Sequence, residues 1–148
     1  MPELTRRPHP ERSDCWHVYY GDVQVGTIAV QSGLPTHARQ WRWDCGFYPL
    51  SHRGRSRSGY AATFEHARAG FEAAWKDYLP RCTEADFDEY RRERAWTAWK
   101  YAMHAAGLPL PTQSTSGQAR CFCGAKIDMA STDPHIHNVH MIAVPELT

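Results

Sequence analysis

The feature that most constrains the fold is a run over residues 41–47, in which large apolar side chains alternate with polar or small ones. Successive side chains of a β-strand point to opposite faces, so this run predicts a strand with one buried aromatic face. Residues 64–79 place apolar side chains at helical spacing, and Thr63 and Pro80 are suited to begin and end that helix. The two apolar faces should pack together, with Trp41, Trp43 and Phe47 against Phe64, Phe71 and Trp75.

Two more strands are predicted ahead of this run, over residues 16–20 and 23–30. Both are rich in β-branched and aromatic residues, and the Gly21-Asp22 pair between them is typical of a two-residue hairpin turn. Residues 1–14 contain three Pro and little apolar material, which predicts a flexible arm, and residues 50–58 predict a loop. The expected fold class is α+β, a three-stranded antiparallel sheet packed on an amphipathic helix.

A second, longer helix is predicted over residues 83–106, where Thr83 and Asp86 approximate a capping box. Its apolar residues occupy two sides of the helix rather than one stripe, which is typical of a helix with two packing partners. Those partners are the sheet and the C-terminal segment, or else a second subunit.

The C-terminal segment carries the strongest chemical motif of the chain. Cys121 and Cys123 precede Gly124, and after thirteen residues the second Cys is followed by His137 and His140, a C-x-C-x13-H-x2-H pattern. Zn²⁺ prefers four sulfur and nitrogen ligands in tetrahedral geometry, and a short segment with few large apolar residues needs such an ion to fold. We therefore expect a structural Zn²⁺ in a ribbon-like hairpin.

Both intervals of the motif are shorter than usual, so the ligand set has alternatives. Most zinc knuckles are C-x2-C, and common fingers have H-x3–5-H. His135 can replace one of the two His, and Cys82 is an alternative ligand from outside the segment. The competing interpretation is that the thiols and the His side chains hold no metal.

Length and composition bound the organisation and exclude several classes. A chain of 148 residues suits one compact unit with a small appendage, and no apolar run approaches the ~18 residues of a membrane span. Five Cys in a chain whose N-terminus has no apolar leader predict free thiols and a cytoplasmic location. The expected parts are an arm (1–14), a βββαα domain (15–106), a linker (107–118) and a zinc-binding hairpin (119–148).

A cluster of Arg residues is the second candidate site. Arg side chains alternating with Gly and Ser can follow a phosphate backbone, and a sheet face can lie in a groove of DNA. The interpretation as a solvated loop without a partner stays open, because the formal net charge of the chain is only +1. The candidate nucleic-acid ligands are Arg39, Arg42, Arg53, Arg55 and Arg57.

Signatures of catalysis are weak. The sequence has no GxSxG, no Gly-rich phosphate loop and no HExxH, and the residues around His135 only distantly resemble a His-metal nuclease core. The sequence thus favours a non-enzymatic zinc-containing module that binds DNA or RNA through the Arg loop and the exposed sheet face. The alternative is a protein–protein adaptor or homodimer that uses the aromatic helix 83–106, and a metal-dependent hydrolase comes third.

Two resemblances can be named. The chain resembles a group of short, uncharacterised bacterial proteins over about nine-tenths of its length, and this likeness implies no activity, although it suggests His137 and His140 as partners of the two Cys. The likeness is carried by the stretches Trp16–Val23, Trp41–Pro49, Ala62–Phe64 and Arg120–Gly124. Residues 16–79 are similar in architecture to the AP2 domain and to the arm-binding domains of tyrosine integrases, which implies binding of DNA through the exposed sheet face.

Overall fold

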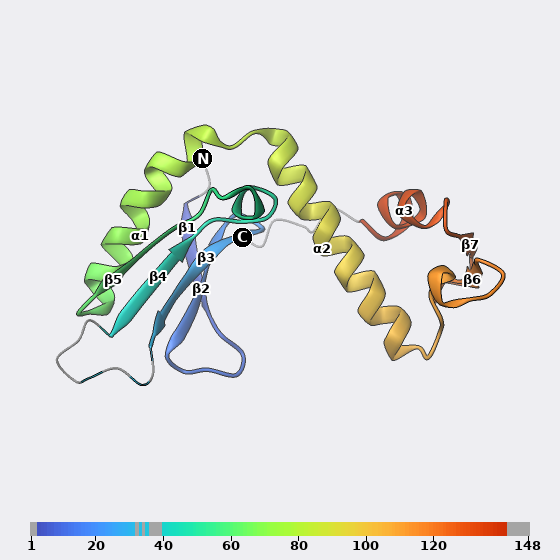
Figure 1. Cartoon of the computed structure of the whole chain (residues 1–148), viewed down its shortest axis with the longest axis horizontal. Helices are drawn as coiled ribbons and strands as arrows, with labels where there is room; N and C mark the ends of the chain where they lie inside the picture. Colours follow the sequence, from blue (N-terminus) through green and yellow to red (C-terminus); the bar gives the residue numbers. More distant parts are fainter. Residues whose placement is uncertain (1–2, 32, 34, 36–39, 142–148) are drawn as a thin grey trace. The chain divides into compact units, whose positions relative to one another are not determined.

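The computed structural model describes residues 3–141 apart from residues 32, 34 and 36–39. The chain is of mixed α and β structure and divides into two compact units, one reaching to Tyr90 and the other beginning at Arg91 (Figure 1). In the part of the chain that is described, no helix has both the length and the apolar character that crossing a membrane requires.

The first unit is built on a five-stranded antiparallel sheet in which each strand pairs with its neighbours in the sequence. The predicted hairpin is confirmed, since Tyr20 pairs with Val23 across the Gly21-Asp22 turn. The strands are β1 (Leu4–Pro8), β2 (Cys15–Tyr20), β3 (Val23–Val30), β4 (Trp41–Cys45) and β5 (Arg57–Ala61).

The prediction of only three strands was wrong, because the sheet has an additional strand at each edge. β1 lies in the segment predicted as a flexible arm, where the Arg6 guanidinium lies 4.7 Å from the ring centres of both Trp16 and Phe64. β5 begins inside the predicted loop (residues 50–58), and a Cβ atom at Gly59 would come within 2.6 Å of the Trp43 ring. Cation–π contacts and close approach of a glycine backbone hold these edges, and neither produces apolar alternation in the sequence.

The predicted core between the sheet and the first helix is confirmed. α1 (Phe64–Tyr78) begins after Thr63, whose hydroxyl accepts a hydrogen bond from the His66 amide. Phe71 and Phe47 are buried, Trp41 and Trp43 are partly buried, and the predicted strand and helix aromatics lie in contact. Their ring centres lie 5.4 Å apart for Trp41–Phe64, 6.4 Å for Trp43–Phe71 and 6.4 Å for Phe47–Trp75.

The long helix α2 (Glu84–Ala105) contributes to both units. Its start has the predicted reciprocal cap, because the Thr83 amide donates to the Asp86 carboxylate and the Asp86 amide donates to the Thr83 hydroxyl. In the first unit, Phe87 stacks on Phe47, and the Tyr90 hydroxyl accepts a hydrogen bond from the Gln24 amide. The two apolar sides of the helix are therefore separated along its length as well as around it.

The second unit combines the rest of α2 with a small two-stranded sheet and a short helical segment. The sheet pairs β6 (Gln118–Arg120) with β7 (Lys126–Asp128), and α3 (Thr132–His135) continues into a π-helical turn, Ile136–His140. The hairpin expectation did not include this helical segment. Leu108 and Leu110, from the predicted linker, pack against the core of the unit, whose buried members are Trp99, Met103, Cys121, Ile127 and Ile136.

Candidate metal centre

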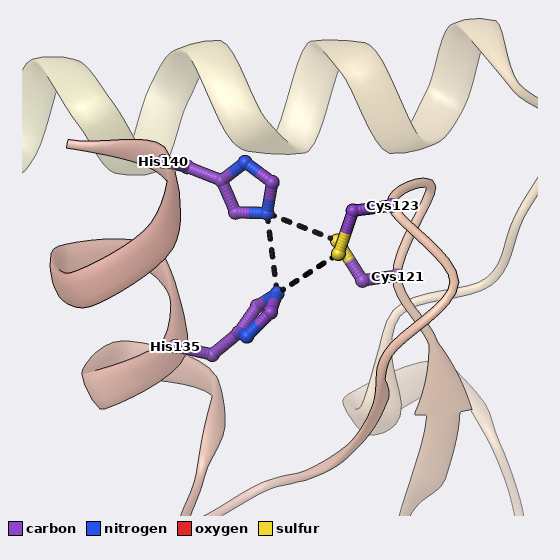
Figure 2. Close-up of side chains that lie close together, drawn as sticks. All are labelled: Cys121, Cys123, His135 and His140. Atoms are coloured by element: carbon purple, nitrogen blue, oxygen red, sulfur yellow. Dashed lines mark hydrogen bonds between the residues drawn. The ribbon is translucent and has the colours of Figure 1, made fainter. Parts of the chain in front are cut away.

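Both sulfur atoms of the candidate site come from the turn that joins β6 to β7. The Cys121 amide donates to the Ala125 carbonyl and the Gly124 amide donates to the Cys121 carbonyl, each at 2.8 Å, which closes a tight turn. Gly124 has a φ of +96°, a conformation that a residue with a Cβ atom rarely adopts. Both thiol groups consequently point to the same side of the hairpin (Figure 2).

The two imidazoles come from the helical segment that follows. His135 is the last residue of α3 and His140 the last of the π-helical turn, where the Met141 amide donates to the Ile136 carbonyl at 2.8 Å. Hydrogen bonds between residues five apart define a π-helical turn, so residues spaced by five lie nearly above one another. The π turn therefore brings His135 and His140 to one face.

The four side chains form a compact cluster whose ligand atoms all lie within 4.8 Å of one another. The Cys121 sulfur is 3.3 Å from His140 Nε2, the Cys123 sulfur is 3.4 Å from His135 Nε2, and the two Nε2 atoms are 3.1 Å apart (Figure 2). In a tetrahedral zinc site, bonds of about 2.3 Å to sulfur and 2.0–2.1 Å to nitrogen place sulfur and nitrogen about 3.5 Å apart and two nitrogens about 3.3 Å apart. These three distances are thus close to the edges of such a tetrahedron.

The four positions differ in their exposure to solvent. Cys121 is buried, Cys123 is exposed and the two His residues are intermediate. Burial, and after it the charge of the neighbouring His135, lower the pKa of His140. The lowered pKa favours the neutral imidazole, which is the form that binds metal ions.

The structure brings together three of the four ligands that the sequence favoured and places the fourth elsewhere. His137 is not part of the cluster, and its Nδ1 atom lies 3.2 Å from the Met141 sulfur. The alternate His135 takes its place, because residues 137 and 140 fall on different faces of the π turn. The sequence holds a partial signal for His135, since His135 and His140 form an H-x4-H pair within the range of common fingers.

Cys82, the other alternative ligand, lies in the first unit and is not part of the cluster. Its thiol donates to the Tyr78 carbonyl at 3.5 Å. Burial, followed by the nearby Asp86 charge, raises the pKa of Cys82 to about 11, so this side chain is held as a neutral thiol.

Three of the candidate Arg residues that the structure describes pair with carboxylates. Arg39 lies outside the described residues. Arg42 binds the Asp44 carboxylate, with guanidinium nitrogens 3.0–3.1 Å from its oxygens. Arg53 lies 3.8 Å from Asp86 and 3.5 Å from Glu89, Arg57 pairs with Asp77, and Arg55 offers its carbonyl to the Tyr78 hydroxyl. Most of this positive charge is compensated by carboxylates of the same unit.

The aromatic residues of helix 83–106 are largely used within the chain. Phe87 and Tyr90 pack on the core of the first unit, and Trp96 and Trp99 belong to that of the second. Tyr101 is the exception among them, with 72% of its surface exposed.

No protein-family description matches this chain, and searches of the curated proteins and of the solved structures found no similar protein. The class of site is therefore defined by its own geometry, a Cys₂His₂ cluster close enough to hold a metal ion.

Proposed function

We propose that the protein is a non-enzymatic zinc-containing binding module in which Cys121, Cys123, His135 and His140 hold one structural Zn²⁺. The observation that carries this proposal is the gathering of two Cys and two His ligand atoms within 4.8 Å, with three of their separations close to the edges of a zinc tetrahedron. A set of two thiolates and two imidazoles in tetrahedral arrangement suits zinc, whereas magnesium and calcium prefer oxygen ligands.

The proposed role of the ion is structural because four side chains complete its coordination. A catalytic zinc keeps one position for water or substrate, and three protein ligands are then usual. The second unit also has a small core, in which one of the five buried apolar side chains among the described residues is the ligand Cys121 itself. Binding of the ion then contributes directly to the folding free energy of this unit.

Metal analysis of matched variants tests both the ion and its ligands. Wild-type protein purified without chelator should carry one zinc per chain. His135→Gln should lose most of that zinc, whereas His137→Gln, two residues away in the same segment, should retain it. Wild-type protein with well under one zinc would overturn the proposal. Zinc loss in His137→Gln but not in His135→Gln would restore the ligand set favoured by the sequence, and a metal with three protein ligands and a water would favour the hydrolase.

Nucleic-acid binding is a second proposed function, and the sheet face directed away from α1 is the feature that favours it. Two Arg–Tyr pairs lie on this face, with the Arg7 guanidinium 4.4 Å from the Tyr19 ring centre and the Arg42 guanidinium 5.5 Å from that of Tyr60. Tyr60 is also 51% exposed. Ordered guanidinium groups can contact phosphates, and exposed aromatic rings can stack on unpaired bases.

A binding titration with single-stranded DNA and RNA at two salt concentrations tests this second function. Affinity should fall steeply as salt rises, and Arg7→Ala and Tyr60→Ala should weaken binding. Arg68→Ala is the matched control, because Arg68 pairs with Glu65 and Glu72 on the surface of α1. Failure of the wild-type protein to bind at ~50 mM salt would exclude the nucleic-acid function and leave the zinc proposal intact.

A further inference from the structure

The two thiol groups of the metal centre have different surroundings. Cys121 is 1% exposed and its sulfur accepts a hydrogen bond from the indole N–H of Trp99, with 3.4 Å between nitrogen and sulfur. Cys123, on the same turn, is exposed to solvent. A bound metal therefore meets one sulfur that the protein covers and one that water can reach.

The indole N–H of Trp99 is buried, and a buried donor needs an acceptor. Trp99 is 2% exposed, so water cannot satisfy its N–H group, and leaving that group unpaired would destabilise the fold. A thiolate sulfur is a stronger acceptor than a thiol, because hydrogen bonds to an ionised group are shorter and stronger. A sulfur that accepts this bond is held in a fixed direction relative to α2, and a metal-bound sulfur can accept it as well.

We infer that Trp99 is a positioning residue of the metal centre, which orients the Cys121 thiolate and tunes the strength of its bond to the metal. This inference rests on the proposed zinc site. Donors that contact metal ligands fix the orientation of those ligands and withdraw electron density from the ligand atom. Trp99 does so from α2, so the helix supplies the metal centre with a hydrogen bond although it supplies no ligand.

A second Trp on the same helix provides the control. The Trp96 indole N–H donates to the Asp133 carboxylate with a nitrogen–oxygen distance of 2.6 Å, and its ring lies 5.5 Å from that of Trp99. Trp96→Phe and Trp99→Phe thus remove the same group from neighbouring sites of one core. Only the second change removes a donor to a metal ligand.

The experiment compares the two variants in the full chain with zinc and with cobalt. Trp99→Phe should weaken zinc affinity by about 10- to 100-fold and move the sulfur-to-cobalt charge-transfer absorption to lower energy. Trp96→Phe should leave that absorption unchanged. Equal absorption and affinity in Trp99→Phe and wild type would overturn the inference, whereas a wild-type protein that takes up no stoichiometric metal would defeat the zinc proposal instead.

A measurement on wild-type protein covers the case in which Trp99→Phe does not fold. In protein loaded with an NMR-active cadmium isotope, the Trp99 indole proton should show scalar coupling to the metal through the sulfur, while the Trp96 indole proton should show none. A Trp99 indole proton without such coupling in cadmium-loaded protein would overturn the inference.

Discussion

The two units of the chain reach stability by different means. The first has a core of fourteen buried residues among those described, drawn from the sheet, the segment between β4 and β5, α1 and α2, whereas the second has five. A small unit buries too little apolar surface to offset the entropy of ordering its chain, and a metal ion is one of the usual additions. The Cys₂His₂ cluster therefore lies in the unit with the smaller apolar core.

Removal of the proposed zinc should have the largest effect on stability. It should unfold one unit and leave the other folded. Structural zinc sites bind with apparent free energies of about 10–16 kcal/mol at neutral pH, and that energy is folding energy. We expect a strong chelator to unfold residues 107–141 and to leave the sheet and α1 folded. Hydrogen exchange followed residue by residue will measure this, and equal protection of both units before and after chelation would contradict it.

Truncation of Phe71, the central aromatic residue of the larger core, should destabilise the first unit and leave zinc binding by the second unit unchanged. Phe71→Ala removes a fully buried ring that packs on Trp43, which should cost about 3–5 kcal/mol of unfolding free energy. Zinc stoichiometry and affinity should stay unchanged, because the ring lies in the first unit. Denaturant unfolding and metal titration of the same preparation will test this, and loss of zinc from this variant would show that the units do not fold separately.

A smaller effect is expected where a glycine accommodates a Trp ring. In Gly59→Ala the new methyl group would lie 2.6 Å from the Trp43 ring, and a Cβ at Gly70 would meet the same ring at 2.6 Å. Overpacking of this kind costs about 1–3 kcal/mol, and thermal unfolding will measure it. Ser58→Ala is the matched control on the same strand, since Ser58 is exposed. Equal stability of both variants would show that the Trp43 ring moves freely.

The smallest change is expected when the native protein is treated with a thiol reagent at neutral pH, because most of its thiols should not be alkylated. Burial raises the pKa of Cys45 to about 12 and that of Cys82 to about 11, so both remain protonated and unreactive. The exposed Cys123 should react once the metal has been removed. Mass spectrometry of alkylated peptides, with and without chelator, checks this order, and rapid labelling of Cys45 in the native protein would refute it.

Periodicity in the sequence predicted the elements whose side chains are buried on one face. The β2–β3 hairpin, β4, α1 and the capped start of α2 all follow from alternation, helical spacing and turn residues. β1 and β5 were missed because edge strands held by Arg6 over Trp16, or by the ring of Trp43 over Gly59, show no such pattern. Apolar periodicity arises from burial of one face, and the two edge strands bury few side chains.

The Cys₂His₂ cluster was predictable in composition but not in every member. Cys121, Cys123 and His140 follow from residue type and order, whereas the choice of His135 depends on a π-helical turn at Ile136–His140. The rotation per residue about the helix axis differs between a π turn and an α turn. Residue spacing in the sequence does not show which of the two turns will form.

In the proposed zinc site, the exposed Cys123 is the side from which an incoming ligand can reach the ion. Exchange of a tetrahedral ion requires an incoming ligand to approach it while one existing bond lengthens, and three of the four ligands are wholly or partly covered. The approach is therefore open on the Cys123 side. We expect the lifetime of the proposed ion to depend on the breaking of the bond to Cys123, and a dissolved thiol or chelator that enters there to shorten that lifetime without changing the affinity of the folded site.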